Sequence, residues 1–330
     1  MLGLMRQARI KILAEEAEAD YHCMSRTVNG ERLFDDVAKE VLRRQLWQVA
    51  DYCGVQILTY TVMSNHFHVV VRVPLQQPVP DAELLRRYRV MYPKPTAYQA
   101  ARLEVIQAQL AENGPDAARW RQQQLRLMGD VSQYMKLVKQ RCSIWYNKSH
   151  RRFGTLWAER FKSVLVGPDA LQTMCAYVDL NCVRAGLVID PKEYRFCGYA
   201  EAVAGNLAAQ TGLRAVVGGT EWNEAQAGYR EMIFGIGGGP QATAASIPAA
   251  EVQRVLAQGG KVPLAAILRC RIRYFTDGAV LGSRAFVEVQ LAAYHRKTGR
   301  REQSEPHALP ACTGWGDLTT LRGLRRRPIG

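Results

Sequence analysis

Residues 55–73 read VQILTYTVMSNHFHVVVRV and contain two β-rich runs joined by a short turn. The runs are 55–63 and 66–73, and Ser64-Asn65 between them has the composition of a turn. Upstream, residues 20–28 favour another strand closed by Asn29-Gly30, and apolar residues recur at helical spacing from 35 to 52, with Gly54 as the stop. Strand, helix, strand, strand is the first half of a β-α-β-β-α-β ferredoxin-like unit, which indicates an α+β fold.

The second half of this unit is predicted further along the chain. We expect a long helix over 131–147, a short strand over 161–166, and a helix that opens at Pro168-Asp169 and runs to about Cys182. Between the halves, about 75–130 is rich in Ala, Gln, Leu and Arg and is interrupted by prolines, which is typical of an inserted helical arm. The sequence therefore predicts one domain over 1–205 with a helical insertion.

The rest of the chain is expected to be a linker over 206–247 and a small basic C-terminal extension over 248–330. The linker is predicted from GIGGGPQATAASIP at 235–248, which fits neither a Walker nor a Rossmann glycine motif, so no nucleotide cofactor is expected. In the extension we expect helices near 248–258 and 283–295 around a β-rich segment at 270–276.

Composition excludes several classes of protein. Of the 330 residues, 48% are hydrophobic and 22% are charged, which is typical of a globular chain and excludes overall disorder. No apolar run approaches the ~20 residues that cross a bilayer, and the N-terminus lacks the pattern of a signal peptide, so we expect no membrane partner and a cytoplasmic protein. The eight cysteines form no C-x-x-C pair, which favours reduced, mostly buried thiols over a zinc ribbon or a disulfide scaffold.

Charge points to a nucleic-acid partner. The 44 Lys and Arg exceed the 30 Asp and Glu, which gives a net charge of +14. Cations concentrate between 131 and 166, interleaved with aromatic residues, as single-stranded nucleic acid requires for phosphate contacts and base stacking. The alternative is a solvated basic helix face with buried aromatic side chains. The candidate DNA-binding residues are Arg151, Arg152, Trp157, Arg160 and Lys162, and Trp157 is either a stacking platform or a buried anchor of its loop.

His66 and His68 are candidate metal ligands. Side chains alternate along a strand, so both imidazoles point to one face while Phe67 points to the other. Two imidazoles ~7 Å apart along a strand can converge on one divalent cation. An ordinary pair of surface or core histidines is the alternative.

Tyr177 and Asn181 are candidates for a nucleophile and a third ligand. They are four residues apart in a predicted helix and so share a face. An amide oxygen can bind a hard cation, and a phenol beside a bound metal can attack a phosphate. Tyr134 and Tyr146 are rival nucleophiles, and a buried tyrosine with an asparagine at a helix end is the alternative interpretation.

Three blocks in order resemble a known family. They are MSNHFHVVV (63–71), FGTLWAERFKS (153–163) and AYVDLNCVRAG (176–186). Together they resemble the one-tyrosine HUH transposases, and in particular the REP-associated tyrosine transposases, over roughly 18–200. The family has a ferredoxin-like fold, in agreement with the predicted strand order.

The resemblance implies roles for the candidate residues. His66 and His68 match the paired metal ligands, Asn181 the polar ligand, and Tyr177 the nucleophile. The implied function is cleavage and rejoining of single-stranded or hairpin DNA through a 5′-phosphotyrosine, with Mg²⁺ or Mn²⁺ as cofactor. The alternative is a domesticated DNA- or RNA-binding protein without turnover.

One position departs from the family pattern. The family usually has proline after the asparagine, where this chain has Cys182, so we expect the helix to run on past Asn181. The sequence leaves open the target DNA, the oligomeric state and the role of residues 206–330.

Overall fold

The fold begins with the four elements that the sequence predicts. The computed structural model describes residues 9–93, 96–235, 250–251, 254–255, 258, 262–277, 279–299, 305–309, 312–313 and 316–321. The first elements are β1 (Ala19–Arg26), α1 (Asp36–Cys53), β2 (Gln56–Val62) and β3 (His66–Val73). The carboxylate of Asp35 caps α1 by accepting from the Ala38 amide, and Gly54 ends the helix at φ +64°.

The central sheet has the predicted ferredoxin-like core. Its strand order begins β2-β3-β1-β4, with β4 at Lys162–Val166, and these neighbouring strands are antiparallel. The α+β prediction is therefore confirmed. Three short strands then extend the sheet beyond β4, in the order β6 (Val280–Gly282), β9 (Thr319–Thr320) and β7 (His307–Ala308). The C-terminal region is thus built onto the sheet.

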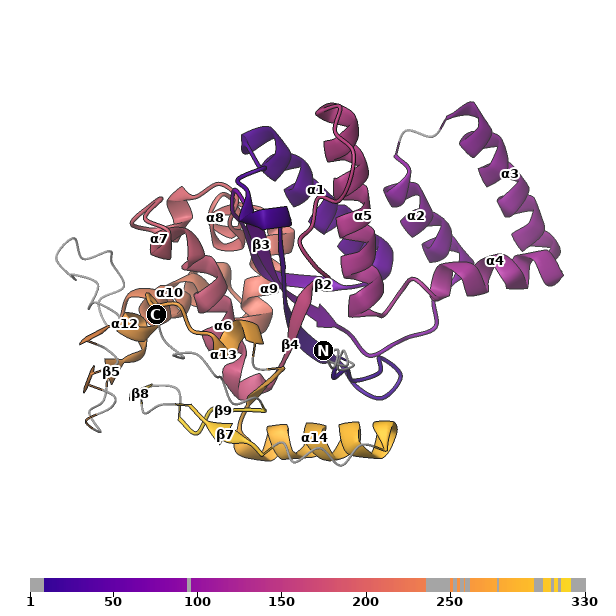
Figure 1. Ribbon diagram of the computed structural model, residues 1–330. Coiled ribbons are helices and arrows are strands. Elements are labelled where there is room, and N and C mark those ends of the chain that lie inside the picture. Colours follow the sequence, from indigo (N-terminus) through magenta and orange to yellow (C-terminus); the bar gives the residue numbers. More distant parts are fainter. Residues whose placement is uncertain are drawn as a thin grey trace, which may run out of the picture.

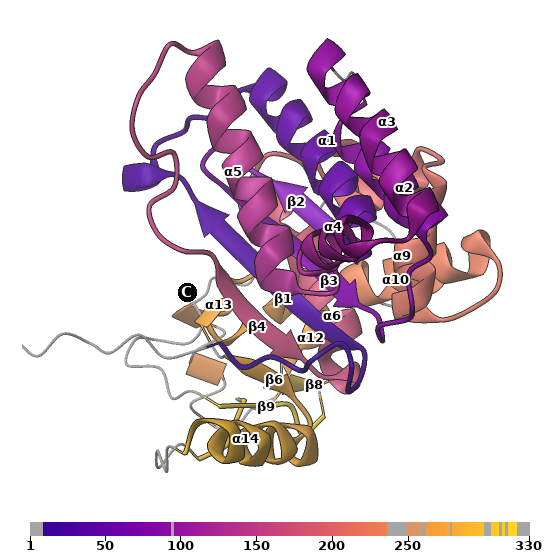
Figure 2. The ribbon, with the colours of Figure 1, turned by 90° about the vertical axis from the view of Figure 1, so that its right-hand side faces the viewer.

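The two faces of the sheet carry different helices (Figure 2). Helices α1 and α5 (Val131–Ser149) pack together on one face, and α6 (Pro168–Asp179) lies against β2 and β3 on the other. The alternation along β3 assigns His66 and His68 to the α6 face and Phe67 to the opposite face, where its ring contacts Trp157.

The inserted arm is helical, as expected. Helices α2 (Asp81–Met91), α3 (Ala97–Glu112) and α4 (Pro115–Leu125) project from the α1 side of the domain (Figure 1). Helix α2 packs along α1 and is tied to it by an ion pair of 2.6 Å between Arg86 and Asp51.

The linker prediction is wrong for the part of 206–247 that the structure describes. That part forms α9 (Leu207–Val217) and α10 (Trp222–Phe234), which bury Leu213, Val216, Tyr229 and Ile233. Helix α9 packs closely on β2 at Gly212, where a Cβ would lie 2.3 Å from the carbonyl oxygen of Ile57. The apolar spacing of these helices precedes the glycine-rich run, and residues 236–249 lie outside the described part.

The C-terminal region differs from the prediction in one further element. Residues expected to be β-rich contain the helical turn α13 (Tyr274–Asp277), preceded by α12 (Leu264–Ile267). The helix expected near 283–295 is present as α14 (Arg284–Thr298), beside β6 and β9 (Figure 2). Most of the helix expected near 248–258 lies outside the described residues.

The remaining elements are short. They are two 3₁₀ turns (Val28–Gly30 and Pro191–Glu193), α7 (Asn181–Arg184), α8 (Gly198–Val203), and the paired β5 (Val262–Pro263) and β8 (Cys312–Thr313). The seven cysteines whose side chains are described are free and buried, as predicted. Among the described helices, none has both the length and the apolar character needed to span a bilayer.

Candidate active site

The two predicted metal ligands lie at the start of β3. His66 is partly buried, and its Nδ1 is 2.6 Å from Oδ1 of the adjacent Asn65. His68 is buried, and its ring centroid lies 5.2 Å from that of His66. The sequence placed both rings on one face, and the structure shows them together there.

A third histidine belongs to the same cluster. His22 of β1 is buried, and its Nε2 lies 2.8 Å from Nδ1 of His68. Its Nδ1 lies 2.7 Å from the carbonyl oxygen of Phe275. Sequence reasoning missed His22, although the pairing of β1 with β3 places it opposite Val70, two residues from His68 on the same face.

Tyr177 and Asn181 come from the helix that covers this face. The Tyr177 ring centroid is 6.5 Å from that of His22 and 6.5 Å from that of His68. The side-chain amide nitrogen of Asn181 lies 3.3 Å from Nε2 of His66. The structure therefore brings all four predicted residues of the chemical site together.

The helix does not run on past Asn181, contrary to the expectation drawn from Cys182. Helix α6 ends at Asp179, Leu180 has ψ 1°, and the short helix α7 begins at Asn181. The Cys182 thiol donates to the Asp179 carbonyl at 3.3 Å, a carbonyl that the broken helix leaves available. The break therefore forms without proline.

The rival nucleophiles lie on the other side of the sheet. Tyr134 and Tyr146 belong to α5. The Tyr134 hydroxyl is buried and donates to the Leu46 carbonyl of α1 at 3.4 Å. Tyr146 stacks on His150 with 4.0 Å between ring centroids. Of the three candidate tyrosines, Tyr177 alone shares a face with the histidines.

Residues 264–277, which we call the cap, cover Tyr177 together with Arg184. The guanidinium of Arg184 lies 3.9 Å from the Tyr177 ring centroid and donates to the carbonyls of Tyr177 and of Leu268 in the cap. The Phe275 ring meets the Tyr177 ring edge-on, with 4.9 Å between centroids. Tyr177 is consequently only 3% exposed.

The imidazoles of the cluster are held neutral. Burial lowers the pKa of His22 to about 4, and burial with the nearby Arg26, Arg271 and Arg184 lowers the pKa of His66 to about 4. Burial and the neighbouring histidines lower the pKa of His68 further. Neutral rings keep a lone pair free to bind a metal.

No carboxylate completes this donor set within the described residues. Asp179, between Tyr177 and Asn181 in sequence, is buried and accepts from Thr59, Tyr229 and Cys197. Burial raises the pKa of the Asp179 carboxyl to about 6. In the described part of the chain, no group of three His, Cys, Asp or Glu side chains is arranged to hold a metal, so any cation here would depend on two imidazoles and the amide of Asn181.

A basic loop, residues 150–161, lies beside the histidines. It joins α5 to β4, and its Ala158 amide donates to the carbonyl of Arg26, the residue that pairs with His66. Arg151 and Arg160 are exposed, and Arg152 is partly buried. Lys162, the next residue but one after Arg160, makes a 2.9 Å ion pair with Asp277 of the cap.

The aromatic side chains of this loop differ in exposure. Trp157 is 8% exposed, packs on Phe34 and Phe67, and donates its indole N–H to the Lys139 carbonyl at 3.1 Å. Phe153 is 94% exposed. The burial of Trp157 favours the anchor interpretation over stacking, and Phe153 is the aromatic side chain available to a base.

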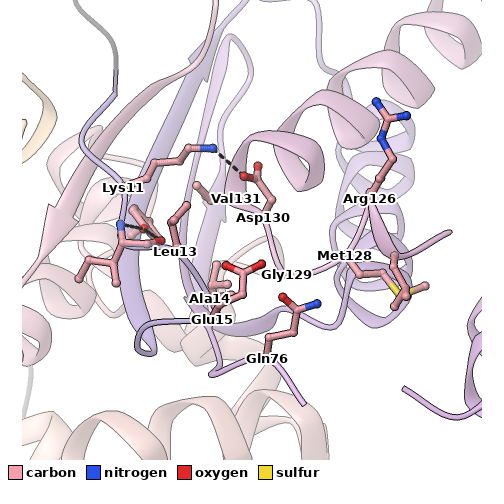
Figure 3. A pocket seen from close by; sticks show the side chains of 14 residues that line it. Lys11, Leu13, Ala14, Glu15, Gln76, Arg126, Met128, Gly129, Asp130 and Val131 are labelled. Carbon is pink, nitrogen blue, oxygen red and sulfur yellow. Dashed lines mark hydrogen bonds and ion pairs between the residues drawn. The ribbon is translucent and has the colours of Figure 1, made fainter. Parts of the chain in front are cut away.

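A separate pocket of about 200 Å³ lies at the opposite end of β3 (Figure 3). Its lining includes Val73, Gln76 and the ion-paired Lys11 and Asp130, 2.6 Å apart. The histidines of the cluster and Tyr177 do not line it, so it is distinct from the candidate site.

Comparison with known proteins agrees with the arrangement of β1, β2 and β3. Residues 16–83, which include these strands, His22, His66 and His68, match the family model described as "Transposase IS200 like". This segment is that of an IS200-like transposase. The resemblance to tyrosine transposases is thereby confirmed at the level of the family, and it supports a DNA-processing transposase function.

One solved structure is also similar to this transposase. It is described as "Structure of the REP associates tyrosine transposase bound to a REP hairpin", and it shares 12% sequence identity with this chain at a TM-score of 0.38. The match covers 62% of this chain and 87% of that chain. A search of curated proteins gives no significant match.

Proposed function

We propose that this transposase cleaves and rejoins single-stranded or hairpin DNA, with Tyr177 as the nucleophile. The observation that carries the proposal is the convergence of Tyr177 with His66, His68 and Asn181 on one face of the sheet. The adjoining basic loop supplies exposed cations for the DNA backbone. Phe153 adds an exposed ring for base stacking.

The donor set fits a divalent cation. His66 and His68 are neutral, and Nε2 of His66 lies within 3.3 Å of the Asn181 amide, whose oxygen is a suitable hard donor. His66, His68 and Asn181 would hold Mg²⁺ or Mn²⁺. When bound, such a cation would offset the charge that develops on the scissile phosphate.

Tyr177 and Arg184 would carry out the chemical step. The Tyr177 hydroxyl oxygen attacks the phosphorus, the bond from phosphorus to the 3′ oxygen breaks, and the phenol proton passes through solvent to the departing oxygen. The products are a 5′-phosphotyrosine and a 3′-hydroxyl. Arg184, 3.9 Å from the ring centroid, places positive charge where the phenol oxygen becomes negative.

Rejoining is the reverse reaction with a second 3′-hydroxyl. Because the phosphotyrosine keeps the phosphoester bond, no nucleotide cofactor is needed. The cap must move before a phosphate reaches the phenol, since Tyr177 is 3% exposed beneath Phe275 and Arg184.

The proposal is tested by tyrosine variants on end-labelled hairpin oligonucleotides taken from the DNA that flanks the gene. Tyr177→Phe should abolish cleavage and leave DNA binding nearly intact, because only the hydroxyl is removed. Tyr134→Phe and Tyr146→Phe are matched controls on the opposite face and should still cut. A Tyr177→Phe protein that cuts at the wild-type rate would contradict the assignment, and binding without cleavage by the wild-type protein would favour the non-catalytic alternative.

A further inference from the structure

Both ring nitrogens of His22 are engaged inside the protein. The ring is 1% exposed, Nδ1 lies 2.7 Å from the Phe275 carbonyl oxygen, and Nε2 lies 2.8 Å from Nδ1 of His68. His22 therefore links the cap, through a residue 253 positions away in sequence, to a candidate metal ligand.

The partners fix the position of every proton in this chain of contacts. A carbonyl oxygen can only accept, so Nδ1 of His22 must carry hydrogen. In the neutral ring Nε2 is then an acceptor, so Nδ1 of His68 must donate to it. His68 consequently keeps its Nε2 lone pair free. A doubly protonated His22 is disfavoured because the ring is buried and near Arg184.

His66 reaches the same proton arrangement by a local route. Its Nδ1 lies 2.6 Å from Oδ1 of Asn65, the preceding residue, and that carboxamide oxygen can only accept. Nε2 of His66 is then the acceptor that faces the Asn181 amide nitrogen at 3.3 Å. The two ligands thus present the same nitrogen, His66 through its neighbour in sequence and His68 through His22 and the cap.

We propose that His22 is a positioning residue that holds His68 with Nδ1 protonated and Nε2 free for the metal, and that the Phe275 carbonyl of the cap sets this arrangement. The proposal rests on the proposed function for the identity of the ligands. It also assigns part of the region beyond the family match, which covers residues 16–83, to the active site.

The proton positions can be read in the metal-free, DNA-free full-length protein. Long-range ¹H–¹⁵N NMR distinguishes the two neutral histidine tautomers, and His22→Gln and His68→Gln spectra assign the signals. We expect both His22 and His68 to carry hydrogen on Nδ1. A wild-type His68 protonated on Nε2 would overturn the proposal, whether or not the protein cleaves DNA.

Variants at His22 test the consequence for metal binding, with Mn²⁺ alone as the probe in calorimetry. His22→Leu removes the acceptor and should weaken Mn²⁺ binding by about 10–100-fold, the usual cost of losing such a partner. His22→Gln offers an amide oxygen to His68 and should stay close to wild type. Met24→Leu, opposite His68 on the same strand face, is the control for a change in packing.

The outcomes separate this proposal from the proposed function. Unchanged Mn²⁺ affinity in a His22→Leu protein with a normal melting curve would overturn the positioning role. If His22→Leu does not fold, the wild-type tautomers decide. Absence of a covalent DNA adduct in the wild-type protein would refute the proposed function, whereas the tautomer result would stand independently.

Discussion

Two aromatic residues of the basic loop, four positions apart, are expected to respond to alanine substitution in opposite ways. Trp157 is 8% exposed and Phe153 is 94% exposed. Removing a buried tryptophan side chain costs about 3–5 kcal/mol of stability. At roughly 2–4 °C per kcal/mol for a domain of about 150–250 residues, Trp157→Ala should lower the melting temperature by roughly 6–20 °C.

Phe153→Ala should leave the melting temperature unchanged, because the ring contributes almost no buried surface. If the ring stacks on a base, the substitution should cost about 1–3 kcal/mol of binding, which is roughly a 5- to 150-fold increase in Kd. The salt dependence of binding should not change, because no phosphate contact is lost.

Thermal melting and fluorescence anisotropy with a labelled hairpin, across a range of salt concentrations and on the same preparations, measure both effects. An unaltered melting temperature for Trp157→Ala would refute the anchor interpretation. Wild-type DNA affinity for Phe153→Ala would show that the exposed ring does not contact DNA.

Three further perturbations separate metal, DNA grip and cap. His66→Ala and His68→Ala should each lose most of the cleavage activity, with Mn²⁺ restoring more than Mg²⁺ because imidazole suits the softer ion; undiminished cleavage in excess EDTA would end the metal hypothesis. Neutralising Arg151 and Arg152 together should weaken binding equally on matched and scrambled hairpins and flatten the log–log salt slope by roughly 0.7 per lost contact, and an unchanged slope would remove the basic loop from the DNA groove. Asp277→Asn breaks the ion pair between the cap and β4, which is worth about 0–1 kcal/mol, so DNA affinity should rise by up to roughly fivefold; equilibrium titration that shows no rise would mean that this pair does not restrain the β4 lysine.

Local patterns in the sequence predicted the parts of the site that depend on one element. The alternation of His66, Phe67 and His68 fixes which side chains share a face, since a strand has a period of two. The spacing of Tyr177 and Asn181 likewise places them one turn apart, and this survives the break at Leu180. The ranking of Tyr177 over its rivals needed the structure, because spacing alone does not say which helix faces the histidines.

Contacts between distant segments could not be predicted. His22 meets the Phe275 carbonyl across 253 positions, and nothing in the local sequence of either residue indicates the pairing. Trp157 and Phe153 have the same aromatic character, yet only Trp157 meets Phe34 and Phe67. The linker prediction failed for a different reason, since the glycine-rich run drew attention from the apolar spacing of the preceding helices.

The covalent intermediate tests the central claim most directly. The wild-type protein is incubated with Mn²⁺ and a hairpin oligonucleotide from the flanking DNA, digested with protease and nuclease, and analysed by mass spectrometry. The account predicts one peptide that carries a 5′-linked nucleotide on Tyr177, and a free 3′-hydroxyl on the released strand. A nucleotide on Tyr134 or Tyr146, or cleavage that leaves no nucleotide on any tyrosine, would contradict it.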